Sequence, residues 1–230
     1  MTPQLSPLDL PKCLAQMLAF AWRSERLPEA AGPRAGVVGT GPPLRLLVLG
    51  DSSGAGVGVA HQDQALIGQM LVHLAPAARV QWELRARSGA TTSAARRMLA
   101  GAGPVDVAVL ALGVNDVLRL TRTARYRAET SALIRALRTR HGARMILASG
   151  VPPLGAFTAF PQPLRRALGL RAARLDAILR ARATELGAFH VPFDMAPAPH
   201  WLARDGFHPG AALYAEWGAR MAGLALRAVS

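Results

Sequence analysis

The chain has 230 residues, of which 51% are hydrophobic, and this is enough apolar material for the core of one α/β domain. Its single cysteine, Cys13, excludes an intramolecular disulfide, so the fold does not depend on an oxidising compartment. The net charge of +13 favours an anionic partner such as a lipid surface or a nucleic acid. The alternative is compositional bias, because Lys12 is the only lysine and the arginines are interleaved with alanine and leucine.

The first 43 residues are expected to lie outside the main domain. The segment from Leu10 to Trp22 is apolar, but Lys12 and Gln16 interrupt it and it is too short to cross a membrane. We expect an amphipathic helix there, with residues 10–23 either packing on the domain or contacting a membrane surface. The following residues, up to position 43, are rich in Pro, Gly and Ala and are typical of a linker. Residues 44–230 are predicted to form the domain.

Short apolar runs alternate with helical patterns along the rest of the chain. The predicted strands are residues 44–49, 80–84, 105–111, 145–148 and 188–191. Apolar residues at helical spacing lie between them, and a last helix is expected to begin at Pro209. This alternation predicts a flavodoxin-like, three-layer α/β/α sandwich around a five-stranded parallel sheet. Sites in such sheets lie outside the carboxyl ends of the strands.

A serine in a glycine-rich turn follows the first predicted strand. Residues 50–58 read Gly-Asp-Ser-Ser-Gly-Ala-Gly-Val-Gly, and a tight turn there would expose the hydroxyl group of Ser52. The spacing fits neither a P-loop nor a dinucleotide fingerprint. It matches the G-x-S-x-G pattern of α/β-hydrolases, but in that fold several strands precede the serine. An ordinary glycine-rich β-to-α turn is the alternative.

Three further motifs supply the partners that a nucleophilic serine requires. Asp205 and His208 lie three residues apart, so the carboxylate can orient a histidine that acts as general base. Asp194 is the rival acid. Asn115, after the third strand, can donate to an oxyanion, and Gly89, after the second, offers an unshielded amide. Each motif alone also fits a loop or a helix cap, but together they fill every role in an acyl-transfer site.

These blocks, in this order, resemble those of the SGNH hydrolase superfamily, also called GDSL-like esterases and lipases. The Ser, Gly, Asn and His of its name would be Ser52, Gly89, Asn115 and His208. One departure is Ser53, where the name-giving pattern has leucine after the nucleophile. The resemblance spans roughly Leu44 to the C-terminus, which would make this part an SGNH-type hydrolase domain.

The resemblance implies a serine hydrolase that cleaves carboxylic esters through an acyl-enzyme intermediate. It implies a catalytic triad of Ser52, Asp205 and His208. It also implies an oxyanion hole made of the Ser52 and Gly89 amides and the Asn115 side chain. No cofactor is expected, and the six histidines show no metal-ligand spacing.

The apolar, proline-rich segment after the fourth strand is expected to bind the acyl group. Leu154, Phe157 and Phe160 are predicted to line the pocket, which favours short or medium acyl chains. The enzymatic alternatives are a lysophospholipase or thioesterase, and a carbohydrate acetylesterase. The non-enzymatic alternative is a basic membrane-binding or nucleic-acid-binding module with a vestigial site. We expect a small-molecule or lipid ester substrate, no nucleic-acid partner and a cytoplasmic location, with residues 10–23 as the candidate membrane contact.

Overall fold

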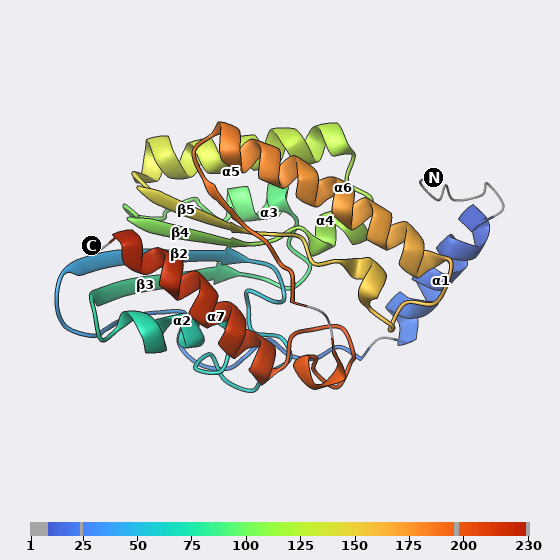
Figure 1. The fold of residues 1–230 in the computed structure, drawn as a ribbon, viewed down its shortest axis with the longest axis horizontal. Coiled ribbons are helices and arrows are strands. Elements are labelled where there is room, and N and C mark those ends of the chain that lie inside the picture. The colour runs from blue at the N-terminus through green and yellow to red at the C-terminus, as the bar shows by residue number, and fades with distance from the viewer. Residues whose placement is uncertain (1–8, 24, 196–197, 229–230) are drawn as a thin grey trace.

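The computed structural model describes residues 9–23, 25–195 and 198–228, which form a three-layer α/β/α sandwich (Figure 1). The strands are β1 (Ala35–Val38), β2 (Pro43–Gly50), β3 (Arg79–Ala86), β4 (Val107–Ala111), β5 (Met145–Ser149) and β6 (Phe189–Val191). The α-helices are α1 (Asp9–Arg23), α2 (Leu66–Leu74), α3 (Thr92–Arg97), α4 (Val114–Leu118), α5 (Thr123–His141), α6 (Leu164–Glu185) and α7 (Ala211–Ala225). Short 3-10 turns are η1 (Leu154–Ala156), η2 (Pro199–Trp201) and η3 (Leu226–Ala228).

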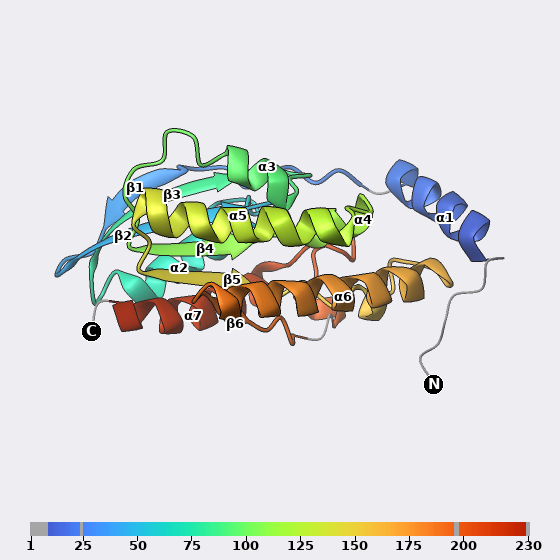
Figure 2. The same cartoon turned by 90° about the horizontal axis from the view of Figure 1, so that it is seen from above.

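Both faces of the sheet are buried, which explains why the strands are nearly continuous apolar runs. In β2, Leu47 and Leu49 belong to the core under α3, α5 and α6, whereas Leu46 and Val48 belong to the core under α2 and α7. Figures 1 and 2 show these two groups of helices on opposite faces of the sheet. Alternate residues of one strand therefore stabilise two separate hydrophobic cores.

The predicted fold class is confirmed, but the sheet has one strand more than predicted. Its order is β1-β3-β2-β4-β5-β6. All neighbours are parallel except β1, which pairs antiparallel with β3 at the sheet edge. The prediction of five strands, all parallel, is therefore wrong at this edge. The extra strand comes from the stretch expected to be a linker, so the sheet begins before Leu44. The division of the chain at residue 44 stays a prediction.

The chain reverses its direction of travel across the sheet at β2. This strand pairs with β3 on one side and with β4 on the other. The loops that leave the carboxyl ends of β2 and β4 consequently diverge toward different helices, and ligands of open α/β sheets bind at such points. Ser52 follows β2, Gly89 follows β3 and Asn115 follows β4. The topology thus delivers three of the predicted site residues to one edge of the sheet.

Helix α1 lies beyond that edge, beside the start of α6 (Figure 2). Cys13 is buried on the side that faces the domain, where Met17 and Phe20 also pack against the core. The side chain of Gln16 donates to the carbonyl oxygen of Gln162 at 2.7 Å and accepts from the Leu164 amide at 3.1 Å. In the part of the chain that the structure describes, no helix is both long and apolar enough to cross a membrane.

The close packing of α7 on α2 gives a test of the fold. A Cβ atom added to Gly218 would lie 2.4 Å from the Cβ of Gln69, so Gly218→Ala should lower the free energy of unfolding by about 1–3 kcal/mol. Gly223, in the same helix, has nothing within 4 Å of such an atom. Gly223→Ala should be neutral or stabilise by up to about 1 kcal/mol. Urea unfolding measures both variants. Equal losses of unfolding free energy would show that the close contact between Gly218 and Gln69 does not cause the effect.

Candidate active site

The turn after β2 is built by two glycines in contact. A Cβ atom on Gly50 would lie 2.6 Å from the Cα of Gly54, and a Cβ atom on Gly54 would meet Gly50 equally closely. The amide of Ala55 closes the turn by donating to the carbonyl oxygen of Asp51 at 2.9 Å. Any larger residue at either glycine position would force the turn open. Ser52 is held within it, at the carboxyl edge of the sheet.

Ser52, His208 and Asp205 form a continuous hydrogen-bonded chain. The Nε2 atom of His208 lies 3.0 Å from the Ser52 Oγ, and its Nδ1 atom lies 2.6 Å from the Asp205 Oδ2. The Asp205 Oδ1 accepts the amides of Phe207 and His208, both at 3.0 Å. Burial alone would raise the pKa of Asp205, but the hydrogen bonds from His208 and Phe207 hold this pKa below its ordinary value. An ionised Asp205 can therefore orient the imidazole toward the serine.

Asp194, the rival acid, has a different environment. Its carboxylate pairs with Arg220, and its side chain is 66% exposed. The structure thus places Asp205, rather than Asp194, against His208. The catalytic role of either aspartate stays a prediction.

Three potential hydrogen-bond donors lie near the hydroxyl group of Ser52, at the edge of an open cleft. Ser52, Gly89 and Asn115 all line this cleft, which has a volume of about 320 Å³. Gly89 has a φ of +77°, a conformation that favours glycine. The Asn115 Nδ2 donates to the Asp51 Oδ2 at 3.2 Å, which leaves its second N–H group available. Within the described ranges, the amides of Ser52 and Gly89 donate to no other protein group. This is the donor set that a developing oxyanion requires.

Two buried aspartates fix the positions of these donors. The Asp51 Oδ1 accepts the Ser53 amide at 3.0 Å, so Asp51 joins the nucleophile turn to Asn115. Burial raises the pKa of Asp51 to about 6. The Asp116 Oδ2 accepts both the amide and the hydroxyl group of Thr92 at 2.8 Å, and so joins α4 to the start of α3. The blocks that contain Ser52, Asn115 and Gly89 are thereby tied together through carboxylates.

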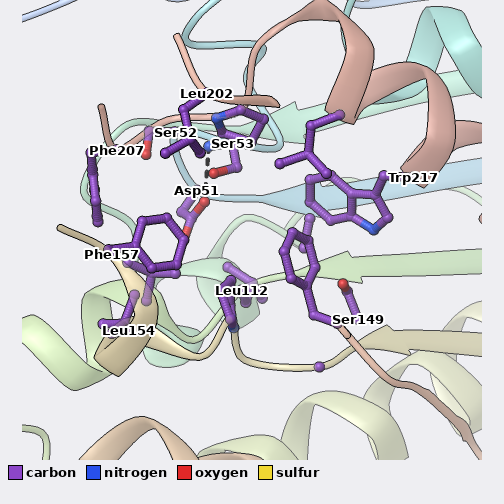
Figure 3. Close-up of a pocket in the computed structure, with 17 residues that line it drawn as sticks. Asp51, Ser52, Ser53, Leu112, Ser149, Leu154, Phe157, Leu202, Phe207 and Trp217 are labelled. Atoms are coloured by element: carbon purple, nitrogen blue, oxygen red, sulfur yellow. Dashed lines mark hydrogen bonds between the residues drawn. The ribbon is translucent and has the colours of Figure 1, made fainter. Parts of the chain in front are cut away.

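A second, small pocket lies on the other side of Ser52 (Figure 3). Its volume is about 40 Å³, and Leu154 and Phe157 are on its walls. Their role in binding the acyl group stays a prediction. Figure 3 shows Phe157 and Trp217 on opposite sides of it. Phe160 is not among the residues that line it. It is buried against Phe20, with ring centroids 4.5 Å apart, so it packs in the core next to α1 rather than on the pocket wall.

A second histidine–aspartate pair supports the sheet edge rather than the serine. The His190 Nε2 lies 2.8 Å from the Asp176 Oδ1, which also accepts the Val151 amide at 2.9 Å. This pair joins β6, α6 and the loop after β5. Among the residues the structure describes, no cluster of three or more His, Cys, Asp or Glu side chains is placed to bind a metal ion.

Comparison with known proteins identifies the family of the chain. A model of the GDSL-like lipase/acylhydrolase family matches residues 48–216. The chain belongs to this family. Residues 48–216 are thus a GDSL-like lipase/acylhydrolase domain, which places the chain in the SGNH hydrolase superfamily.

The relatives include a curated protein and several solved structures. The GDSL-like esterase Rv1075c of Mycobacterium tuberculosis is 32% identical over 186 residues, which are 75% of this chain and 58% of that protein. The chain therefore spans less than two thirds of the length of this relative. The psychrotrophic esterase EstA from Pseudoalteromonas sp. has the same fold, with a TM-score of 0.63 and 19% identity over 80% of this chain and 97% of EstA. TesA gives a TM-score of 0.62 and 23% identity over 81% of this chain and 99% of TesA.

In this member of the GDSL-like family, the segment of residues 25–34 contacts two of the site loops, which the sequence did not indicate. The Glu29 Oε1 accepts the Ser88 amide at 2.6 Å, next to Gly89. The Ala30 amide donates to the carbonyl oxygen of Ala55 in the nucleophile turn at 3.2 Å. Burial alone would raise the pKa of Glu29, but hydrogen bonds from Ser88 and Arg34 lower it. This segment precedes the matched residues 48–216, and its linker-like composition concealed its contacts.

Helix α7 holds the nucleophile turn against the histidine loop. The Tyr214 hydroxyl lies 2.9 Å from the carbonyl oxygen of Ser53 and 2.8 Å from that of Val57. A Cβ atom on Gly58 would lie 2.1 Å from the carbonyl oxygen of Pro209, so only glycine permits the two loops to approach this closely. These contacts set the distance between Ser52 and His208.

Removing the Glu29 carboxylate should loosen the Gly89 donor. Because Ser88 would lose its acceptor, Glu29→Ala should lower kcat about tenfold and leave KM nearly unchanged, as expected for a group that acts in the transition state. Glu29→Gln should retain most activity, since its amide oxygen can still accept from Ser88. Steady-state kinetics on a p-nitrophenyl ester measures both variants.

The control for this prediction is Glu185→Ala, which breaks an exposed ion pair with Arg182 at the end of α6. Such pairs contribute little, so its kinetics should match the wild type. Equal effects of Glu185→Ala and Glu29→Ala, or no rescue by glutamine, would contradict the positioning role.

Proposed function

We propose that this protein is a serine esterase that hydrolyses carboxylic esters of short acyl chains through an acyl-enzyme intermediate. The observation that carries the proposal is the chain from Ser52 through His208 to Asp205, with heavy-atom distances of 3.0 and 2.6 Å. Serine is a weak nucleophile unless a base takes its proton, and this chain provides an oriented base. Family membership supports ester hydrolysis, and the geometry supports the assignment of roles.

In the proposed reaction, the Ser52 Oγ attacks the ester carbonyl carbon while the His208 Nε2 takes the hydroxyl proton. The amides of Ser52 and Gly89 and the side chain of Asn115 stabilise the negative charge on the carbonyl oxygen. His208 then protonates the leaving alcohol as the C–O bond breaks. A water molecule, deprotonated by His208, then attacks the acyl carbon. The bond from this carbon to the Ser52 Oγ breaks, the acid leaves, and His208 returns its proton to the Ser52 Oγ.

The two pockets beside Ser52 suggest where the two halves of the ester bind. The small pocket with Leu154 and Phe157 on its walls suits the acyl group, and its volume of about 40 Å³ favours a short chain. The open cleft of about 320 Å³ contains His208, which must protonate the departing oxygen, so it suits the alcohol. Phe20 and Leu27 line the same cleft, which favours an alcohol with an apolar part.

A panel of p-nitrophenyl esters from acetyl to dodecanoyl tests the proposal. The wild type should hydrolyse the short members best, and Ser52→Ala should be inactive. Asn115→Ala should lower kcat by about 10²–10³, the typical cost of one oxyanion donor. A phosphonate should label the wild type and not Ser52→Ala in mass spectrometry; EstA from Pseudoalteromonas sp. was crystallised inhibited by monoethylphosphonate. Full activity of Ser52→Ala would rule out the assignment.

The acyl pocket has a matched pair of test variants. Phe157 lines the small pocket, so Phe157→Ala should enlarge it and shift the preferred acyl chain to longer esters. Phe160 is equally buried but lies off the pocket wall. Phe160→Ala should lower the unfolding temperature, as loss of a buried phenyl group does, without changing the order of preference among esters. The same ester panel, read as kcat/KM, distinguishes them, and an unchanged profile for Phe157→Ala would place the acyl group elsewhere.

A further inference from the structure

Helix α1 has two apolar faces, of which only one packs on the domain. Cys13, Met17 and Phe20 face the core. The opposite side presents four large side chains at every fourth position, with exposed fractions of 74% for Leu10, 59% for Leu14, 65% for Leu18 and 85% for Trp22. A helix that only covered its own domain would carry polar residues there.

The exposed side chains on α1 continue onto neighbouring elements. Leu120 and Leu170 are also exposed, and a groove of about 390 Å³ is lined by both of them together with Leu10 and Leu14. We call Leu10, Leu14, Leu18, Trp22, Leu120 and Leu170 the apolar platform. Of the nine exposed large hydrophobic residues in the described ranges, the platform holds six. Such concentration on one face marks an interaction surface rather than scattered exposure.

The charge around the apolar platform is mostly basic, with one acidic residue of α1, Asp9, on the wall of the groove. Lys12 and Arg23 stand on α1 itself, Arg26 follows it, and Arg174 lines the groove beside Leu10 and Leu14. None of these four side chains forms an ion pair within the described residues, whereas Glu25, the nearest acidic residue after α1, is paired with Arg204. Basic residues that flank exposed leucine and tryptophan are the pattern of helices that lie in an anionic lipid interface.

The apolar platform also adjoins the mouth of the active-site cleft. Ala21, between Leu18 and Trp22 on the exposed side of α1, lines the same cleft as Ser52 and His208. Phe20 lines it as well, and its ring packs against Phe160 in a tilted arrangement and against Phe207 edge to face. A surface in contact with the apolar platform would therefore also lie against the mouth of the active-site cleft, through which an ester enters.

We propose that the apolar platform docks on an anionic lipid surface and presents the open cleft to esters held in that surface. The boundary between headgroups and acyl chains receives the exposed side chains of α1, which are Leu10, Leu14, Leu18 and Trp22. The anionic headgroups pair with the nearby basic residues Lys12, Arg23, Arg26 and Arg174. This inference rests on the proposed esterase for its consequence, but lipid binding itself does not require catalysis. An apolar ester in the lipid then reaches Ser52 along Ala21 and Phe20.

Co-sedimentation with vesicles of phosphatidylcholine, with or without phosphatidylglycerol, tests the docking. The wild-type protein should bind the anionic vesicles, more weakly at high salt, and bind the neutral ones poorly. Combined Leu14→Ser, Leu18→Ser and Trp22→Ser should weaken this binding about tenfold or more. The emission of Trp22, the most exposed of the tryptophans described, should shift to the blue on binding.

A matched control replaces the three exposed large hydrophobic residues outside the platform, through Val37→Ser, Val72→Ser and Phe189→Ser. It should bind vesicles like the wild type. Both triple variants should keep the wild-type kcat/KM on water-soluble p-nitrophenyl acetate, so a failure of lipid binding is distinguishable from a failure of the esterase. No wild-type binding to anionic vesicles, or equal loss in both variants, would overturn the proposal. So would sedimentation equilibrium showing a dimer that only the platform variant dissociates, because the occupant would then be a second copy of the chain.

Discussion

The contact between Gly50 and Gly54 is the constraint on which the site depends. It folds the chain back at the end of β2 so tightly that neither residue has room for a side chain. This turn directs the Asp51 carboxylate inward, toward the Ser53 amide and Asn115. The other site loops are then positioned relative to the turn, by Tyr214 from α7 and by the Ala30 amide from the preceding segment.

The carboxylates of Asp51 and Asp205 change the stability of the fold with pH in opposite directions. For Asp51 the folded-state pKa of about 6 lies above the ordinary value of 3.8, so the folded state binds its proton more tightly than the unfolded chain does. This contribution to stability is therefore largest below pH 3.8 and is lost as the pH rises to about 6, a change of about 3 kcal/mol. Asp205 behaves in the opposite way: its lowered pKa gives stability that is present at neutral pH and lost on acidification. The ionised Asp51 thus weakens the fold at the pH where it holds Asn115.

Most of the architecture could be predicted because its signals are local. Five apolar runs mark the buried strands, and since parallel strands end at one edge, the motifs after them were expected to converge there. The strand β1 could not be predicted, because four residues with two exposed positions pair only where the edge of β3 is available. The contact of Glu29 with Ser88 has no sequence pattern, since it joins residues 59 positions apart. Phe157 and Phe160 share one aperiodic loop, and only tertiary packing decides which of them faces Ser52.

Cys13 places a reactive group, a thiol, at the contact between α1 and the domain. It is the only thiol of the chain, and it is buried on the side of α1 that faces the core. It is 8% exposed and also lines the groove beside Leu10 and Leu14, so a molecule that covers the groove would shield the sulfur from alkylation. The alkylation rate of Cys13 therefore reports whether the groove is open or covered. This rate can be measured on the unmodified protein, without a label or a substitution.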